Sequence, residues 1–190
     1  MKILITDIDE VLLAWSKSFD KFIRENYEYT GIYIAESGQR LWELIDVPKE
    51  IIGEVMSEHT CLPSFGHLDY HNDAEVLNHN KDTFDKIIAI TSCGNESHIM
   101  EARNNNIAEK FPDTIDEIIY LDYLEEKIQT IEKLISENPE AEFYMIDDSV
   151  LDIEKAIELG VKGYVYKTTF HDSKDLPTVD SLSEFFRVIV

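Results

Sequence analysis

Basic residues are scarce in this chain. Its 190 residues include 17 lysines and arginines against 39 aspartates and glutamates, a formal net charge of −22 at pH 7. Nucleic acids and anionic membranes are bound through basic patches, because lysine and arginine neutralise the phosphates. The shortage argues against bulk nucleic acid and against a membrane surface as partners. It does not exclude a small anionic ligand whose charge a bound cation could balance.

Cysteine and long apolar runs are also in short supply. Only Cys61 and Cys93 occur, without a C-x-x-C spacing, so we expect no disulfide framework and a reducing, intracellular setting. The apolar runs fall well short of the ~20 residues that a membrane helix needs. The opening MKILITDIDEVLLAW is interrupted by acids and does not resemble a signal peptide. These features predict a soluble cytoplasmic protein.

Hydrophobic residues nevertheless make up 44% of the chain, enough to build a core. Short β-branched runs are typical of buried parallel strands, and five occur: Lys2–Asp7, Lys86–Thr91, Glu117–Leu121, Glu142–Ile146 and Gly163–Tyr166. Helical patterns follow at Asn95–Lys110, Leu124–Asn138, Ser149–Leu159 and Ser181–Val190. This alternation predicts an α/β fold, a doubly wound, Rossmann-like parallel sheet of about five strands with helices on both faces.

A long interval separates the first two predicted strands. It contains helical patterns at Ser16–Tyr27 and Pro48–His59, a weaker one at Ser37–Ile45, and a turn-rich run from Leu62 to Asn80. A single crossover helix needs far fewer residues. We therefore expect residues 13–85 to form a small helical cap inserted after strand 1. Residues 1–12 and 86–190 would form the core.

Four aspartates fall at the ends of predicted strands. Asp7 ends the first strand and Asp9 follows two residues later, while Asp147 and Asp148 follow the fourth. Open parallel sheets bind ligands at the carboxyl ends of their strands, so these carboxylates should converge on one edge. Packed together they would repel one another unless a cation lay between them. Mg²⁺ prefers carboxylate and carbonyl oxygens and shares its shell with phosphates, so a magnesium site is predicted here.

The chain resembles the haloacid dehalogenase (HAD)-like hydrolase superfamily, whose best-known members are Mg²⁺-dependent phosphatases. The resemblance covers the predicted sheet and rests on four matches in the right order. They are the segment DIDEVL, the threonine of IIAITS, a lysine near the start of a later helix, and the segment IDDSVLD. Each match alone is common, but all four at strand and helix ends form a specific pattern. The resemblance implies a HAD-like core.

The resemblance also implies a role for each acidic position. Asp7 would be the nucleophile that attacks phosphorus and forms an aspartyl-phosphate. Asp9 would be the general acid and base, and its main-chain carbonyl would bind the metal. Asp7 and Asp148 would be direct ligands of Mg²⁺, with Asp147 acting directly or through a water. Asp152 would orient the outer shell, although it is equally typical of an ordinary acid in a first helical turn.

The substrate phosphate would be held by a second set of residues. By resemblance, the hydroxyl of Thr91 and the neighbouring Ser92 would bind the transferring phosphoryl group. Thr91 could instead simply cap the following helix. Lys127 would pair with Asp7 and the phosphate, with Lys110 and Lys133 as competing candidates.

One position departs from the family pattern. Position 10 is Glu, where the family usually has a small residue. Its side chain could point to solvent, or it could crowd the pocket with an extra negative charge. The second possibility keeps a rival hypothesis open, a catalytically weakened HAD-fold protein that binds a metal, a phosphate or a partner.

The resemblance implies a Mg²⁺-dependent phosphatase acting through an aspartyl-phosphate. A cap over the site favours a small phosphorylated metabolite or nucleotide over a protein or a duplex. The run SFGHLDYHNDAEVLNHN before IIAITS is similar to the 5′(3′)-deoxyribonucleotidase branch, which implies a nucleoside monophosphate; a sugar phosphate is the alternative. A receiver-like phosphoacceptor domain fits less well, because its reactive aspartate would end the third strand, which here leads only to Asp122. The oligomeric state is left open.

Overall fold

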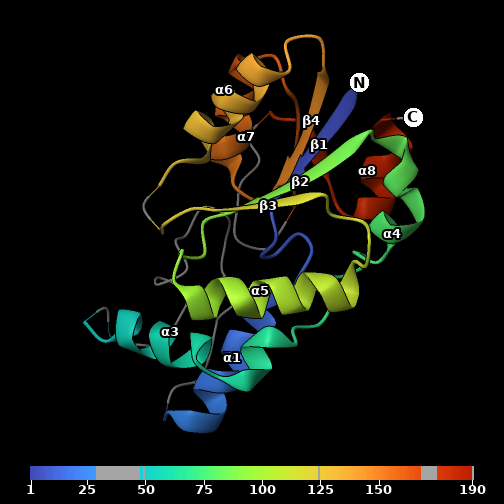
Figure 1. The fold of residues 1–190 in the computed structure, drawn as a ribbon. Helices are drawn as coiled ribbons and strands as arrows, with labels where there is room; N and C mark the ends of the chain where they lie inside the picture. Colours follow the sequence, from blue (N-terminus) through green and yellow to red (C-terminus); the bar gives the residue numbers. More distant parts are fainter. Residues whose placement is uncertain (29–47, 49, 124, 168–174, 190) are drawn as a thin grey trace.

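The computed structural model describes residues 1–28, 48, 50–123, 125–167 and 175–189. Across them, six parallel strands form one sheet in the order β3-β2-β1-β4-β5-β6 (Figure 1). The strands are β1 (Lys2–Thr6), β2 (Lys86–Thr91), β3 (Glu117–Tyr120), β4 (Glu142–Asp147), β5 (Lys162–Tyr166) and β6 (Thr178–Val179). The predicted α/β, doubly wound fold class is confirmed. The additional strand, β6, has two residues and is too short for a recognisable pattern.

The helices of the core lie close to their predicted positions. They are α5 (Ser97–Lys110), α6 (Lys127–Glu137), α7 (Val150–Glu158) and α8 (Leu182–Ile189). The hydroxyl of Ser149 accepts a hydrogen bond from the Asp152 N–H and so caps the start of α7. Gly160, with a φ of +86°, follows the end of the same helix, where a left-handed residue is commonly needed.

Two apolar clusters cover the two faces of the sheet. Successive residues of a strand point to opposite faces, so Leu4 packs in one cluster and Ile5 in the other. The Leu4 cluster includes Phe185 of α8, and the Ile5 cluster includes Ile131 of α6 and Ile153 of α7. Figure 1 shows α6 and α7 on one side of the sheet and α4 and α8 on the other.

The interval between β1 and β2 contains α1 (Trp15–Asn26), α3 (Ile52–Thr60), the 3-10 turns η1 (Pro63–Gly66) and η2 (Lys81–Thr83), and α4 (Val76–Asn80). The predicted helix at Ser37–Ile45 lies outside the described residues. Helices α1 and α3 share a separate apolar cluster built on Phe19, Phe22, Ile23 and Val55. They lie beyond the carboxyl ends of the central strands (Figure 1).

The last part of the interval packs differently. Leu68, Ala74, Leu77 and Phe84 join the apolar cluster beneath α8 rather than the cluster of α1 and α3. The role of residues 13–85 as a cap stays a prediction. No helix among the described residues is long and apolar enough to cross a membrane.

Candidate active site

Three of the predicted acids meet at the carboxyl edge of the sheet. Thr6 pairs with Ile146, and the Asp7 N–H donates to the Ile146 carbonyl at 3.1 Å, so Asp7 and Asp147 end adjacent strands side by side. Each of Asp7, Asp147 and Asp148 offers a carboxylate oxygen, and these oxygens all lie within 4.8 Å of one another. Oxygen donors gathered in this way suit a hard divalent cation.

Lys127 lies inside this cluster. It is the first residue of α6 and is 5% exposed, and its Nζ donates to Asp7 Oδ1 and to Asp147 Oδ2, both at 2.7 Å. Burial by itself lowers the pKa of Lys127, but the carboxylates of Asp147 and Asp7 outweigh burial and raise the pKa above its usual value. The lysine therefore stays charged. The competing lysines, Lys110 and Lys133, instead pair with nearby glutamates of their own helices.

The single ammonium does not neutralise three carboxylates. Burial raises the pKa of Asp7 well above its usual value, with Lys127 opposing the shift and Asp147 reinforcing it. Burial likewise raises the pKa of Asp147 to about 6, again against the attraction of Lys127. Burial is the main cause of both shifts, and the charges of the neighbouring aspartates add to it. A divalent cation between these oxygens would supply the missing charge, so the donor set fits Mg²⁺.

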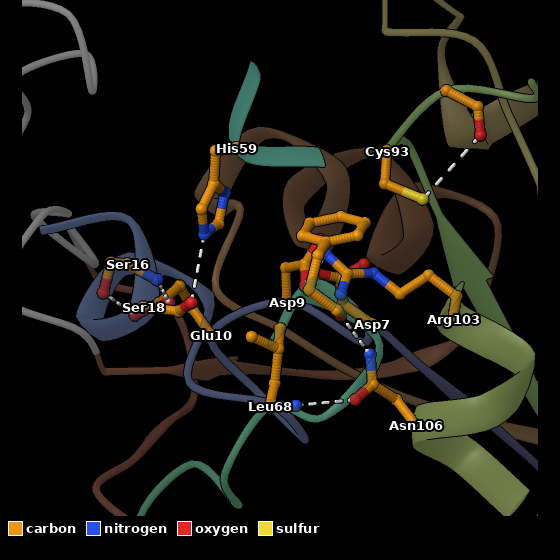
Figure 2. Close-up of polar contacts among 12 residues, drawn as sticks. Asp7, Asp9, Glu10, Ser16, Ser18, His59, Leu68, Cys93, Arg103 and Asn106 are labelled. Atoms are coloured by element: carbon orange, nitrogen blue, oxygen red, sulfur yellow. Dashed lines mark hydrogen bonds and ion pairs between the residues drawn. The ribbon is translucent and has the colours of Figure 1, made fainter. Parts of the chain in front are cut away.

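The Asp9 side chain contacts Arg103 rather than Lys127. Its two carboxylate oxygens lie 2.8 Å and 2.9 Å from Nη2 of Arg103, which comes from α5 (Figure 2). Burial raises the pKa of Asp9, and the charge and hydrogen bond of Arg103 oppose the rise. The Asp9 side chain is 23% exposed, whereas that of Arg103 is fully buried. Asp9 therefore lies at the edge of the site, with its carboxylate held by Arg103 and part of its side chain exposed.

Glu10 caps the start of α1. Its carboxylate accepts the Ser16 N–H at 2.6 Å and the Ser16 hydroxyl at 2.7 Å, replacing the cap that Ala14 cannot provide (Figure 2). The side chain is 12% exposed, so the alternative that it points to solvent is wrong. Burial raises the pKa of Glu10 to about 7. Its φ of +62° is a left-handed conformation that glycine adopts without strain, which explains why a small residue suits this position.

The loop after β2 requires a left-handed backbone at Gly94, whose N–H donates to the Leu121 carbonyl. Thr91, 1% exposed, ends the strand two residues beyond Ala89, the partner of Thr6, and Ser92 follows it at the same edge. Gly94 has a φ of +96°, and a Cβ there would lie 2.5 Å from Glu96 Oε2 and 2.9 Å from the Tyr123 ring. Only glycine therefore fits. Burial raises the pKa of Cys93 to about 11, so its thiol is a poor nucleophile.

Sequence reasoning misses the buried cation beside Asp9. Arg103 stands midway between Ile99 and Ile107 on the apolar stripe of α5, and a lone charge on such a stripe is the available signal. Sequence reasoning also misses His59. It is fully buried among aromatic rings, with Nε2 3.0 Å from the Ser18 hydroxyl. Burial lowers the pKa of His59 to about 4, so it stays neutral.

The sheet order, with the acid cluster at the carboxyl ends of β1 and β4, defines a Rossmann-like α/β fold of the HAD-like type. Solved structures that carry this fold match the chain along nearly its whole length. No family model matches the sequence, and no curated protein matches it closely enough to count as a relative.

Three of these structures illustrate the likeness. A HAD-like family hydrolase from Streptococcus pneumoniae is 13% identical with a TM-score of 0.62, and the match covers 99% of this chain and 98% of that one. A protein assigned as a phosphoglycolate phosphatase from Lactobacillus delbrueckii subsp. bulgaricus is 13% identical with a TM-score of 0.65, covering 100% and 98%. The L-2-haloacid dehalogenase from Xanthobacter autotrophicus, solved with chloropropionic acid covalently bound, is 10% identical with a TM-score of 0.60, covering 100% and 98%. Identities this low establish the fold and leave the activity to be argued from the site.

Proposed function

We propose that the protein is a Mg²⁺-dependent phosphatase that hydrolyses a small phosphomonoester through an aspartyl-phosphate on Asp7. The observation that carries the proposal is the buried Lys127 ammonium, which bridges Asp7 and Asp147 at 2.7 Å within a three-carboxylate cluster. Phosphoryl transfer spreads negative charge over the equatorial oxygens of phosphorus, and fixed positive charges stabilise it. A nucleophile held between a lysine and a cation site meets that requirement.

The reaction divides into two displacements. A carboxylate oxygen of Asp7 attacks phosphorus, the bond from phosphorus to the ester oxygen breaks, and Asp9 gives its proton to the departing oxygen. Water then attacks the phosphorus of the aspartyl-phosphate and gives a proton to Asp9, while the bond between phosphorus and the Asp7 oxygen breaks. Inorganic phosphate leaves, and Asp7 and Asp9 return to their starting states. Thr91, Ser92 and the N–H groups of the loop after β2 would hold the phosphoryl oxygens.

The metal would be held by Asp7, Asp148, the main-chain carbonyl of Asp9 and Asp147, the last directly or through a water. When bound, it supplies positive charge to the phosphoryl oxygens and lets the crowded carboxylates ionise together. Lys127 keeps the Asp7 side chain in place between the two displacements.

The substrate is proposed to be a small soluble phosphate rather than a macromolecule. In this proposal residues 13–85 cover the carboxyl edge, which excludes water and selects the leaving group. A nucleoside monophosphate is the narrower candidate, and a sugar phosphate is the alternative. The net charge of −22 cannot draw an anion in from a distance, so binding should depend on the metal.

Two rival functions, dehalogenation and binding without catalysis, account for fewer of the residues in the site. A halide leaves without a proton, so dehalogenation would give Asp9 and the acid cluster no evident task. The rival of a catalytically weakened binding protein depends on Glu10 crowding the site. The Glu10 carboxylate is bound by Ser16 at the start of α1, while the charges of Asp148 and Asp9 still raise its pKa.

A phosphatase screen tests the proposal. The purified protein is incubated with 4-nitrophenyl phosphate, nucleoside monophosphates, sugar phosphates and 2-chloropropionate, each with Mg²⁺ and with a chelator. We expect phosphate release that requires Mg²⁺, is abolished in Asp7→Asn and persists in Asp82→Asn, a matched change at an exposed aspartate. Release of chloride without phosphate release would contradict the proposal, as would no turnover across the panel.

A further inference from the structure

Arg103 is a fully buried cation on the inward face of helix α5, beside Ile99, Ile107 and the polar Asn106. Its guanidinium carbon sits 4.2 Å from the centre of the Phe65 ring of η1. Its only ion pair among the described residues is with Asp9, through Nη2. The contact joins residues 94 positions apart in the sequence. Arg103 is thus placed by the folded structure against one side chain of the candidate site.

Packing alone does not account for this arginine. Nε and Nη1 of Arg103 are buried and find no hydrogen-bond partner among the residues that the structure describes. Burying a guanidinium is costly, and replacing a buried ion pair with apolar residues of similar volume often leaves stability unchanged or improved. A methionine could cover Phe65 as well. What a methionine could not do is hold the Asp9 carboxylate.

The surroundings of Arg103 are fixed from both sides. One turn further along α5, Asn106 accepts the Leu68 N–H at 2.7 Å and donates to the Phe65 carbonyl at 2.8 Å. Gly66 also runs beside α5, because a Cβ added there would be in ordinary van der Waals contact with Ala102, 3.8 Å from its Cα. These contacts hold η1 on α5, so the Phe65 ring and the guanidinium keep one relative orientation. The Asp9 carboxylate cannot rotate without breaking its contact with Nη2.

We propose that Arg103 is a positioning residue for the acid–base step. It holds the Asp9 side chain beside the oxygen that leaves, where Asp9 acts as the protonated acid, and beside the water that replaces it, where Asp9 acts as the carboxylate base. This inference rests on the proposed phosphatase function. Arg103 exchanges no proton itself; the proton moves from Asp9 to the departing oxygen and returns from the attacking water. Misplacing a catalytic group by about 1 Å can cost on the order of 10²-fold in rate, so a fixed carboxylate matters.

The test compares leaving groups. 4-Nitrophenolate departs readily without a proton, whereas an alkoxide needs one, so only alkyl phosphates require Asp9 as an acid in the first displacement. Arg103→Met and Arg103→Lys are assayed with 4-nitrophenyl phosphate and with an alkyl phosphate taken from the substrate screen. Lys110→Met is the matched control, because it removes a cation from the same helix at an outer ion pair with Glu109. Circular dichroism checks that each variant is folded.

We expect Arg103→Met to lower kcat/KM for the alkyl phosphate by about 100-fold and to leave kcat/KM for 4-nitrophenyl phosphate within about 3-fold, the range of general acid catalysis being 10²–10⁴. kcat should fall for both substrates, because the attack of water needs Asp9 in either case, and 4-nitrophenol should then appear in a burst. Arg103→Lys, which keeps the charge, should recover part of the loss. Lys110→Met should leave the ratio of the two kcat/KM values unchanged.

Equal losses of kcat/KM for both substrates would overturn the inference, because a structural role would affect them alike. An unchanged kcat/KM for the alkyl phosphate would overturn it too. If Arg103→Met does not fold, the ratio measured with Arg103→Lys decides. Failure of the unaltered protein to hydrolyse either substrate would refute the phosphatase proposal itself, which separates the two claims.

Discussion

At the scale of single residues, Glu10 couples the candidate site to the segment that follows it. Its carboxylate holds the first turn of α1 while lying close enough to Asp148 and Asp9 for their charges to raise its pKa further. The Glu10 side chain thus contacts α1, the first helix of residues 13–85, and also lies close to the acids at the carboxyl edge of the sheet. Its protonation state should be visible in the stability of the protein.

The Glu10→Gln variant tests this in metal-free protein. The folded-state pKa of about 7 lies above the ordinary value of 4.5, so the stabilising contribution of Glu10 is complete below pH 4.5 and is lost as the pH rises through 7. We expect Glu10→Gln to match the unaltered protein near pH 4 and to exceed its free energy of unfolding near pH 8. The difference should be on the order of 3 kcal/mol, because the rise from 4.5 to about 7 is worth about 1.4 kcal/mol per pKa unit.

Urea unfolding at a series of pH values measures the effect. Glu10→Ala is the control, because it removes the cap of α1 and should be less stable than Glu10→Gln by about 1 kcal/mol at every pH. A difference between Glu10→Gln and the unaltered protein that does not vary with pH would show that Glu10 is ionised throughout.

Residues of the site differ in how far sequence alone can place them. Asp7 and Asp147 end β-branched runs, so the rule for parallel sheets predicts that they lie together, and their carboxylates meet as that rule requires. Lys127 can be chosen only by resemblance, and the structure puts its ammonium on both aspartates. Arg103 cannot be placed, because its burial depends on Phe65 and Asp9 from distant segments. The orientation of Glu10 depends in the same way on where α1 begins.

At the scale of elements, α7 and β5 approach unusually closely. Gly163 in β5 faces α7, and a Cβ there would lie 3.0 Å from side-chain carbons of both Ile153 and Ile157. Ile153 belongs to the apolar cluster beneath α6 and α7, and the partly buried Ile157 packs against it. A glycine in the strand thus lets the helix pack against the sheet next to β4, which carries Asp147.

A pair of glycine-to-alanine variants measures that packing. Gly163→Ala should destabilise the protein by about 1–3 kcal/mol, because the new methyl group overfills a packed contact. Gly53→Ala, in the exposed first turn of α3 with open space around the position, should instead stabilise it by about 0.5–1 kcal/mol. Guanidinium unfolding of both variants gives the comparison. Equal effects would mean that helix α7 can shift away at little cost.

Strands and helices whose pattern lies in their own residues can be predicted from the sequence, whereas those that depend on contacts with distant segments cannot. The sequence predicts strands β1, β2 and β4 within a residue of their observed bounds, because continuous β-branched runs have few alternatives when both faces are buried. Strand β6 escapes prediction, because its two residues gain strand geometry only by pairing with β5. Residues 62–80 read as a turn-rich run, and the helix α4 inside them is short and packs beneath α8.

At the scale of the whole molecule, the net charge of −22 comes both from exposed acids and from the acid cluster of the candidate site. Na⁺ and Mg²⁺ should distinguish these two contributions. Among the residues that the structure describes, most of the acids are exposed, and any salt screens their repulsion. The cluster of Asp7, Asp147 and Asp148 is a local excess that only a bound cation relieves. Salt in general should therefore stabilise the protein, and Mg²⁺ should add to that stabilisation through one site.

Thermal unfolding in MgCl₂ and in NaCl of equal ionic strength separates the two components. At a Mg²⁺ concentration 100 times its Kd, specific binding should add about 2.7 kcal/mol to the free energy of unfolding beyond the effect of NaCl. In Asp148→Asn the extra stabilisation by Mg²⁺ should shrink while the response to NaCl stays, because one ligand is lost and the surface charge hardly changes. Identical Tm values in the two salts would show that the acid cluster holds no magnesium. The candidate active site would then need another source of positive charge for a phosphate.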